Sequence, residues 1–315
     1  MPRLLITRRL PDRVLDAARA RFDVTLRDAT TALNAAELRA ALRDFDAVLP
    51  TLGDRFQADV FADVPNPRAK ILANFGAGYN HIDTEAARAH GIAVTNTPGA
   101  VTDATADIAL TLILMTARRA GEGERLLRAG QWQGWHPTQL LGQHVTGRSV
   151  GIIGMGRIGQ AIARRCHHGF GMAVRFHNRS PVTLDFPASQ VPLPDALQAD
   201  IIVLAVPGGP ATRHLINAAA LARMQPHAIL INISRGDVVD EQALMAALQT
   251  RQIAGAGLDV YEHEPNVPAE LIARENVTLL PHLGTAALDV REAMGLMAIA
   301  NLTAHFDGQP LPNPV

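Results

Sequence analysis

Short apolar segments alternate with longer segments of helical periodicity along the first third of the chain. The helical patterns span Arg13–Phe22 and Thr84–His90. The apolar segments, each short enough to be one buried strand, are Leu4–Ile6, Ala47–Leu49, Ile71–Ala73 and Ile92–Val94. Strands that alternate with helices are typical of βαβ units, whose strands align in a parallel sheet. The pattern therefore predicts a first parallel sheet with helices on its faces.

A second series of apolar segments follows after residue 148. Its members are four to six residues long and lie at 150–153, 173–176, 201–206, 229–232, 257–260 and 277–280. Two longer helical patterns, Ala104–Arg119 and Ala286–Phe306, flank this series. We expect them to join the two parts of the chain, the second helix returning it to the first part. The predicted fold class is α/β, with two doubly wound parallel sheets.

The composition fits a packed protein and excludes several partners. Apolar residues make up 48% and charged residues 19% of the 315 positions, a length that favours two domains. Lys and Arg number 29 against 30 Asp and Glu, so no basic surplus favours nucleic acid or an anionic membrane. No apolar run approaches the ~20 residues of a membrane span, and no secretory signal is expected. The single cysteine, Cys166, fits a reducing compartment, and we expect a cytoplasmic protein.

A glycine-rich turn follows the first strand of the second series. Gly154-Met155-Gly156-Arg157-Ile158-Gly159 lies between the apolar strand Ser149–Ile153 and the helical pattern Gln160–Cys166. In this context the glycines permit a tight turn, close approach of a pyrophosphate and close packing of helix on strand. The turn predicts a dinucleotide site at Gly154, Gly156, Arg157, Ile158 and Gly159. A glycine turn without a ligand is the structural alternative.

The end of the following strand bears on the choice of cofactor. An NAD site commonly places Asp or Glu about 20 residues after the glycines, whereas this chain has Asn178, Arg179 and Ser180. No carboxylate would repel a 2′-phosphate here, and a guanidinium with a hydroxyl could bind one. We therefore expect NADP as cofactor, with NADPH preferred and NAD possible. An ordinary polar turn before Pro181 is the alternative.

Three later apolar segments each end in residues suited to chemistry. These ends are Ile233–Gly236, Tyr261–Pro265 and Leu280–Gly284. Ligands of open α/β sheets bind outside the carboxyl ends of the strands, so these side chains are expected to converge above the cofactor.

Taken together, these motifs resemble the D-2-hydroxyacid dehydrogenase family. The resemblance runs from Asn74–Gly78 through the glycine turn to Pro281–Gly284 and so covers nearly the whole chain. It implies a Rossmann cofactor domain at 99–287 and a flavodoxin-like substrate domain at 1–98, completed by 288–315. It also implies an active site in a cleft between the two domains.

The resemblance implies that Arg235, Glu264 and His282 are catalytic, and the chemistry of reduction asks for such a set. His282 is suited to donate a proton to a carbonyl oxygen that gains charge as hydride arrives. Glu264 would stabilise the imidazolium. Arg235 offers a planar fork that matches a substrate carboxylate and can polarise the adjacent carbonyl.

Further site residues are expected from the same resemblance. Ala77 and Gly78 would bind the substrate carboxylate through backbone amides, and the loop that contains Leu52 would limit the size of the pocket. Thr105 resembles the family's contact to the cofactor phosphate, and Asp259 completes the expected cofactor set. Trp135 would reach a substrate, in its own subunit or in a neighbouring one. No metal site is expected, because Cys166, His167 and His168 are consecutive and do not share a helix face.

Within the family, glyoxylate and hydroxypyruvate reductases are the most similar branch, on the evidence of Pro137–Gln139, Gly154–Gly159 and His177–Ser180. The expected reaction is NAD(P)H-dependent reduction of a small 2-oxo acid to the 2-hydroxy acid, D-specific where the product is chiral. A phosphoglycerate dehydrogenase or another member of the family is the alternative. A dinucleotide-sensing co-repressor is the alternative of another class. The resemblance also implies a homodimer.

Overall fold

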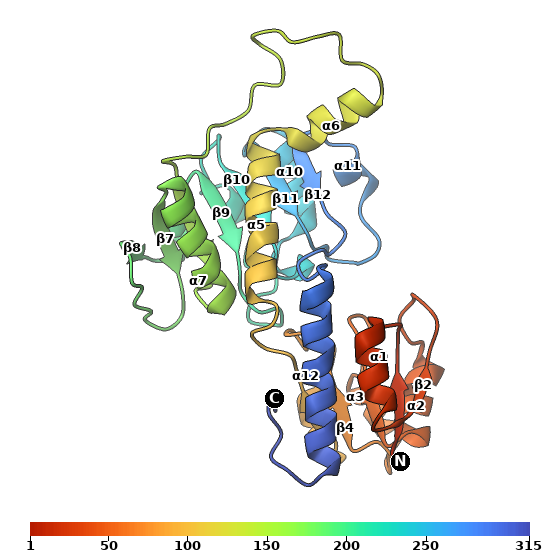
Figure 1. The fold of residues 1–315 in the computed structure, drawn as a ribbon. Helices are drawn as coiled ribbons and strands as arrows, with labels where there is room; N and C mark the ends of the chain where they lie inside the picture. The colour runs from red at the N-terminus through yellow and green to blue at the C-terminus, as the bar shows by residue number, and fades with distance from the viewer. The chain divides into compact units, whose positions relative to one another are not determined.

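The structure is a computed structural model that describes residues 1–315 (Figure 1). The chain divides into two compact units. Unit 1 comprises Met1–Val101 and Thr285–Val315, and unit 2 comprises Thr102–Gly284. Each unit contains one parallel sheet covered by helices, which confirms the predicted α/β class. None of the helices is long and apolar enough to cross a membrane.

Unit 1 is built on a five-stranded parallel sheet in the order β2-β1-β3-β4-β5. Its strands are β1 (Arg3–Ile6), β2 (Asp23–Leu26), β3 (Ala47–Leu49), β4 (Ile71–Ala73) and β5 (Ala93–Thr95). Its helices are α1 (Asp12–Arg19), α2 (Ala35–Asp44), α3 (Ala58–Ala62), α4 (Thr84–Ala89) and α12 (Leu288–Phe306).

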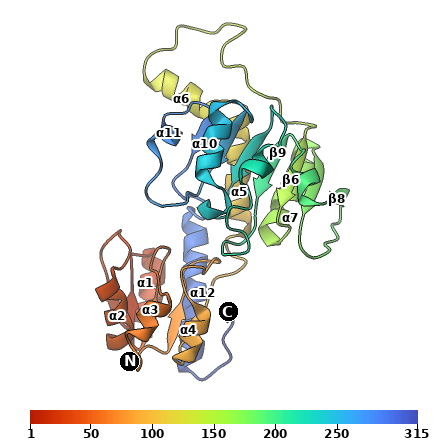
Figure 2. The same cartoon turned by 180° about the vertical axis from the view of Figure 1, so that it is seen from behind.

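The central strands of unit 1 are buried on both faces, because alternate side chains enter two different cores. Leu5, Val48 and Leu72 pack with side chains from α2, α3 and α4. Their neighbours, such as Ile6 and Leu49, pack instead with side chains from α1 and α12. Figure 1 shows α1 and α12 on one face, and Figure 2 shows α2, α3 and α4 on the other. Strands of this kind read as continuous apolar runs, as the sequence does here.

Unit 2 is built on a seven-stranded parallel sheet in the order β12-β11-β10-β9-β6-β7-β8. The strands are β6 (Ser149–Ile153), β7 (Ala173–His177), β8 (Ala188–Gln190), β9 (Ile201–Leu204), β10 (Ile229–Asn232), β11 (Gly255–Leu258) and β12 (Val277–Leu279). The α-helices are α5 (Thr102–Ala117), α6 (Ala120–Arg128), α7 (Arg157–Arg164), α8 (Leu193–Ala196), α9 (Ala218–Leu221), α10 (Glu241–Gln249) and α11 (Ala269–Ile272), supplemented by the short helices η1 (Arg165–Gly169) and η2 (Gly236–Val238). Helices α5 and α7 cover one face of this sheet, and α10 covers the other (Figures 1 and 2).

The strand order of unit 2 reverses between β6 and β9. From β6 the chain proceeds outward through β7 and β8, and it then returns to place β9 on the other side of β6. Ligands of doubly wound sheets bind at such a reversal, outside the carboxyl ends of the strands. The fold therefore places the glycine turn, which follows β6, at the expected position for a ligand.

Two edge strands, β2 and β8, were not anticipated from the sequence. Their side chains alternate between exposed and half-buried or lie mostly exposed, and neither strand contains a continuous apolar run. Each is paired on one side only, to β1 and to β7 respectively. An edge strand contributes little to the core, so the apolar pattern that reveals a central strand is missing.

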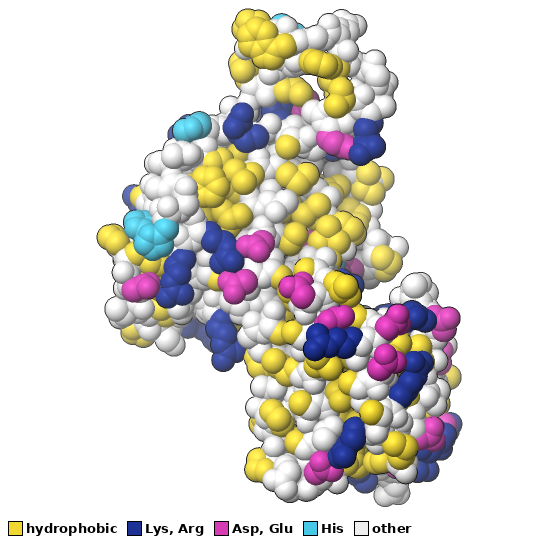
Figure 3. All heavy atoms as spheres, viewed as in Figure 1, with side chains coloured by type: hydrophobic (Ala, Val, Ile, Leu, Met, Phe, Trp, Pro, Cys, Tyr) yellow, Lys and Arg dark blue, Asp and Glu magenta, His cyan; other side chains and the backbone are white.

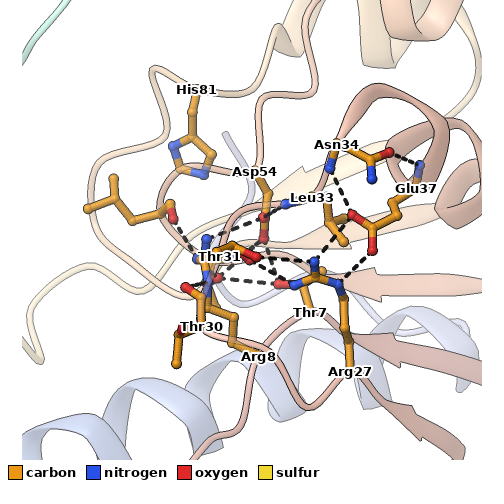
Figure 4. Close-up of polar contacts among 12 residues, drawn as sticks. Thr7, Arg8, Arg27, Thr30, Thr31, Leu33, Asn34, Glu37, Asp54 and His81 are labelled. Carbon is orange, nitrogen blue, oxygen red and sulfur yellow. Dashed lines mark hydrogen bonds and ion pairs between the residues drawn. The ribbon is translucent and has the colours of Figure 1, made fainter. Parts of the chain in front are cut away.

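A buried carboxylate fixes the loop that follows β3 in unit 1 (Figure 4). The Asp54 side chain is fully buried, and its oxygens accept hydrogen bonds from the Thr7 hydroxyl at 2.6 Å and from the N–H groups of Leu33 at 3.0 Å and Thr51 at 2.9 Å. The Arg8 guanidinium lies 3.7 Å from the same carboxylate and donates to the carbonyl of Leu52 at 2.6 Å. This network holds the loop from which the half-exposed Leu52 side chain projects.

We expect Asp54→Ala to lower the free energy of unfolding by about 3 kcal/mol. The substitution removes a buried acceptor and leaves several donors and the Arg8 charge without their partner. Asp63→Ala is the matched control, because Asp63 forms its ion pair with Arg39 at the surface, and such pairs contribute less than about 1 kcal/mol. Denaturant unfolding of both variants measures the difference. Equal losses would show that the Asp54 network does not stabilise the unit.

Candidate active site

Four strands of unit 2 carry the predicted site residues at their carboxyl ends, along the same edge of the sheet. Strands β6, β10, β11 and β12 run parallel, and β9 lies between β6 and β10. The glycine turn follows β6, Arg235 follows β10, Glu264 follows β11 and His282 follows β12. Because parallel strands end at one edge, residues far apart in the sequence are brought to a common side of unit 2.

The glycine turn has the backbone geometry that its sequence predicts. Gly154 has a φ of +97°, and an added Cβ there would lie 2.6 Å from the carbonyl oxygen of Ala205. At Gly159 an added Cβ would lie 2.1 Å from the carbonyl oxygen of Gly154, so only glycine lets α7 pack against the turn. At Gly156, in contrast, an added Cβ would have no atom within 4 Å, so there is open space beside the backbone.

The open space lies at the N-terminal end of α7. Gly156 and Arg157 are exposed, Ile158 is half-buried, and α7 begins at Arg157. The first N–H groups of a helix lack partners within it, and the helix dipole favours an anion beside them. The turn therefore fits a pyrophosphate, which is the part of a dinucleotide that the sequence motif predicts.

The Asn178 side chain is already engaged in hydrogen bonds within the chain. Its Oδ1 accepts from the N–H of Met155 at 3.1 Å, and its Nδ2 donates to the carbonyl of Ser180 at 2.9 Å. Asn178 thus links the glycine turn to the loop after β7. The Arg179 and Ser180 side chains are exposed, and neither makes a hydrogen bond or ion pair within the chain. Of the three residues predicted here, these two have side chains available to a ligand.

His282 and Glu264 form a direct pair. The Nδ1 atom of His282 lies 2.9 Å from Oε2 of Glu264, and each side chain is about 30% exposed. Because a carboxylate only accepts hydrogen bonds, the proton of this pair belongs on Nδ1. The opposite ring nitrogen, Nε2, is then the atom that can exchange a proton with a substrate.

Glu264 is held in its ionised form. Burial would raise the pKa of this carboxyl, but the hydrogen bond from His282 and its charge, the N–H of Tyr261 at 3.1 Å and the charge of Arg235 together lower the pKa below its ordinary value. The negative charge therefore remains across the pH range in which an imidazole changes its protonation. A carboxylate in this state accepts the hydrogen bond from Nδ1 of His282.

Arg235 lies on extended backbone three residues after the end of β10 and is half-buried. Burial lowers the pKa of Arg235, whereas the carboxylates of Glu264 and Asp237 raise it, and an arginine in such surroundings stays charged. The neighbouring Gly236 explains how close the two loops come. An added Cβ at Gly236 would lie 1.8 Å from the backbone carbon of Tyr261, so the Arg235 loop packs directly on the Glu264 loop.

Asp259 holds the turn that carries His282. Its buried carboxylate accepts from the N–H groups of Leu283 at 2.6 Å and Gly284 at 2.8 Å, and its carbonyl accepts from the N–H of His282 at 2.9 Å. Burial raises the pKa of Asp259, opposed by the bonds from this turn and by the His282 charge. Both oxygens face the chain itself, so the structure gives Asp259 a positioning role, and its predicted contact with a cofactor stays a prediction.

Thr105 also contacts the histidine turn. It is buried near the start of α5, and its hydroxyl donates to the carbonyl of Gly284 at 3.2 Å. A hydroxyl has one donor, so a contact with a cofactor phosphate would require it to rotate away from this bond.

Two residues that support the site were not predicted from the sequence. Asn232 donates to the carbonyl of Arg235 at 2.9 Å, and its Oδ1 accepts from the N–H of Ser234 at 3.0 Å. The Tyr261 hydroxyl donates to the carbonyl of Leu280 at 2.9 Å, joining the loops after β11 and β12. Asn232 could have been noticed in the sequence as a polar residue at the end of an apolar strand. A polar side chain in that position is buried, as Asn232 is, and buried polar groups need hydrogen-bond partners.

The substrate residues predicted in unit 1 lie after two adjacent strands, β3 and β4. Asn96 donates to the carbonyl of Ala77 at 2.7 Å, and Asn74 donates to the carbonyl of Gly78 at 3.0 Å. The N–H groups of Ala77 and Gly78 donate no hydrogen bond within the chain. Fixed carbonyls with uncommitted N–H groups are suited to bind an anion such as a carboxylate.

Trp135 lies in the long segment between α6 and β6 and is 79% exposed. Figure 1 shows this segment at the end of unit 2 opposite the carboxyl ends of the strands. Within one copy of unit 2, the structure therefore does not bring Trp135 to His282.

Comparison with known proteins agrees with this arrangement. Residues 110–284 match the family described as D-isomer specific 2-hydroxyacid dehydrogenase, NAD binding domain. The glyoxylate reductase of Thermococcus onnurineus is 43% identical, with 100% of this chain and 96% of the relative covered.

Solved structures are similar along the whole chain. A protein from Thermus thermophilus shares 42% identity with a TM-score of 0.92 over 99% of both chains. The NADPH-dependent glyoxylate/hydroxypyruvate reductase of Sinorhizobium meliloti, solved with NADP and malonate, shares 38% identity with a TM-score of 0.88, covering 100% of this chain and 96% of that one. The family match and the full-length relatives confirm the resemblance seen in the motifs: this chain belongs to the D-isomer specific 2-hydroxyacid dehydrogenases.

Proposed function

We propose that this protein reduces small 2-oxo acids, glyoxylate and hydroxypyruvate, to 2-hydroxy acids with NADPH as the preferred cofactor. The product is the D-isomer where it is chiral. The observation that carries the proposal is the 2.9 Å pair of His282 and Glu264, which lies at the same sheet edge as the glycine turn and Arg235. The names of the similar reductases agree with it.

The catalytic residues divide the reaction between them. The cofactor, when bound, supplies a hydride to the carbonyl carbon of the substrate. His282 donates a proton from Nε2 to the carbonyl oxygen, and Glu264 stabilises the imidazolium before that transfer. Arg235 binds the substrate carboxylate and polarises the carbonyl. After turnover, His282 regains a proton from solvent.

The remaining predicted residues complete the substrate and cofactor contacts. Ala77 and Gly78 bind the substrate carboxylate through their N–H groups, and Leu52 limits the size of the acid. The cofactor contacts are Gly154, Gly156, Arg157, Ile158, Gly159, Asn178, Arg179, Ser180, Thr105 and Asp259. The open backbone at Gly156 supports the assignment of the glycine turn, and the exposed side chains of Arg179 and Ser180 support their own. The side chains of Asn178, Thr105 and Asp259 make hydrogen bonds within the chain, so their assignment rests on the family resemblance.

We propose a homodimer in the cytoplasm. Apolar side chains gather on the surface over α5 (Figure 3), where Asp107, Leu110 and Leu114 border a groove shared with Arg164 and Phe170. The part of the chain between α5 and β6 adds four apolar side chains that are more than half exposed, Leu127, Trp132, Trp135 and Leu141. A second copy of the chain would cover these groups, and a partner's Trp135 could then approach a substrate. The molecular mass in solution tests this, because a monomeric mass at micromolar concentration would contradict it.

Turnover with a panel of 2-oxo acids tests the proposed reaction. We expect the wild type to reduce glyoxylate and hydroxypyruvate and His282→Ala to lose ~10²–10⁴-fold in kcat, since it lacks the proton donor. Cofactor affinity should stay nearly unchanged. His263→Ala is the matched control, an exposed histidine next to Glu264. Wild-type turnover in His282→Ala would remove the histidine from the mechanism, and no turnover with any acid would favour a binding function.

The pH profile tests the pairing of the same histidine with Glu264. Reduction needs protonated His282, so kcat/KM should fall at alkaline pH as the imidazole loses its proton. Glu264→Gln removes the carboxylate that accepts the hydrogen bond from Nδ1 of His282 and should move this alkaline limb to lower pH. A limb that keeps its position in Glu264→Gln would contradict the pair.

The cofactor preference depends on Arg179. A charge-assisted hydrogen bond to a 2′-phosphate contributes about 1.5–3 kcal/mol, equivalent to roughly tenfold to a hundredfold in affinity. We expect wild-type kcat/KM to be higher with NADPH than with NADH and Arg179→Ala to lose most of that difference. Arg175→Ala is the control, because Arg175 is an exposed arginine on β7. A wild type that prefers NADH, or an Arg179→Ala variant that keeps the full NADPH preference, would contradict this assignment.

A further inference from the structure

The side chain of Gln190 closes the loop after β7 with three hydrogen bonds. Its Oε1 accepts from the N–H of Val182 at 3.1 Å, and its Nε2 donates to the carbonyls of Asn178 at 3.0 Å and Ser180 at 3.1 Å. The acceptor faces an N–H and the donors face carbonyls, so one orientation of the amide satisfies all three contacts. A single side chain thus binds both ends of the segment 178–182.

The position of Gln190 is set by the edge strand β8. Gln190 lies opposite Phe176 in the parallel ladder of β7 and β8, and the N–H of Val191 donates to the carbonyl of Phe176 at 2.9 Å. Phe176 is buried, which anchors β7 in the core of unit 2. The ladder therefore places the Gln190 amide beside the loop that begins two residues after Phe176.

The hydrogen bonds of Gln190 act on the backbone and leave the side chains of the loop uncommitted. Gln190 is itself exposed, and it contributes no apolar group to the core. Arg179 lies between the two carbonyls that the Gln190 amide holds, and the Arg179 side chain is exposed without a partner in the chain. The three hydrogen bonds of Gln190 thus fix the backbone from which the Arg179 and Ser180 side chains project. The entropy cost of ordering that backbone is met before a ligand binds.

Asn178 extends the same network to the glycine turn. It donates to the carbonyl of Ser180, which Gln190 also binds, and it accepts from the N–H of Met155. The loop that bears Arg179 is therefore connected to the turn that fits a pyrophosphate. In a dinucleotide phosphate, the pyrophosphate and the 2′-phosphate are separated by one ribose, so a fixed distance between their binding groups favours simultaneous contact.

We propose that Gln190 is a specificity-determining positioning residue, which selects for the 2′-phosphate of the cofactor by holding the Asn178–Val182 loop in its binding conformation. The proposal rests on the proposed preference for NADPH. Gln190 does not touch the cofactor, and it acts through Arg179 and Ser180. Its loss should therefore weaken the binding of ligands that carry a 2′-phosphate and spare ligands that lack it.

Titration calorimetry with small probes tests this without any turnover. We would measure the Kd of 2′,5′-ADP and of 5′-AMP, which differ in the 2′-phosphate alone, for the wild type, Gln190→Met and Arg179→Ala. Gln190→Met keeps the length of the side chain and removes its hydrogen bonds. We expect 2′,5′-ADP binding to weaken about two- to tenfold in Gln190→Met, with 5′-AMP binding unchanged. Ser189→Ala is the matched control, an exposed residue of the same strand.

A double variant separates positioning from a general loss of structure. If Gln190 acts through Arg179, adding Gln190→Met to Arg179→Ala should weaken 2′,5′-ADP binding much less than in the wild-type background. Equal weakening for both probes, or a lower thermal unfolding midpoint with no change in their ratio, would overturn the proposal and assign Gln190 a structural role. If the wild type prefers 2′,5′-ADP and Gln190→Met keeps the full preference, the positioning role alone fails. If the wild type does not discriminate between the probes, the proposed NADPH preference fails as well.

Discussion

The buried carboxylate of Asp259 is the interaction on which the rest of the site depends. Its two oxygens accept hydrogen bonds from backbone N–H groups of the turn that follows β12, and the backbone carbonyl of Asp259 accepts one from the N–H of His282. His282 has a φ of +56°, a conformation that a residue other than glycine keeps only where its surroundings hold it. Hydrogen bonds to a charged acceptor away from water are strong enough to do so. Asp259 therefore orients the His282 imidazole toward Glu264 by holding the backbone of the turn that carries it.

The catalytic pair is supported from both of its sides. Tyr261 donates its N–H to Glu264, and its hydroxyl reaches the carbonyl of Leu280, two residues before His282. The same tyrosine packs on Gly236, which brings the Arg235 loop against it. The loops after β10, β11 and β12 thus contact one another through their backbones. These contacts fix the positions from which the Arg235, Glu264 and His282 side chains project. Such prior organisation lets charged groups stabilise a developing charge without rearrangement.

The sequence predicted the central strands, the strand ends and the pairing of His282 with Glu264 well. It missed the edge strands and the hydrogen bonds of the amide side chains. Strands buried on both faces read as apolar runs, which is why β6 and β7 were located to within a residue. The edge strands β2 and β8 lack that signal, and the role of Gln190 depends on β8. Asn178 was assigned to the cofactor from its position alone. Which groups an amide side chain binds depends on neighbours such as Met155 that only the folded loop brings near.

Unit 1 is assembled from both ends of the chain, and this has a consequence for how the protein is made. Ala298, Ile299 and Leu302 of α12 are buried in the core that contains β1 and α1, and the N–H of Val315 donates to the carbonyl of Val94 in β5. Unit 2 is continuous in sequence and can form as soon as residue 284 leaves the ribosome. The first hundred residues instead lack α12 until residues 288–306 are made, so α1 alone covers that face of their sheet throughout the synthesis of unit 2. During translation the nascent chain therefore exposes an apolar surface of the kind that chaperones bind.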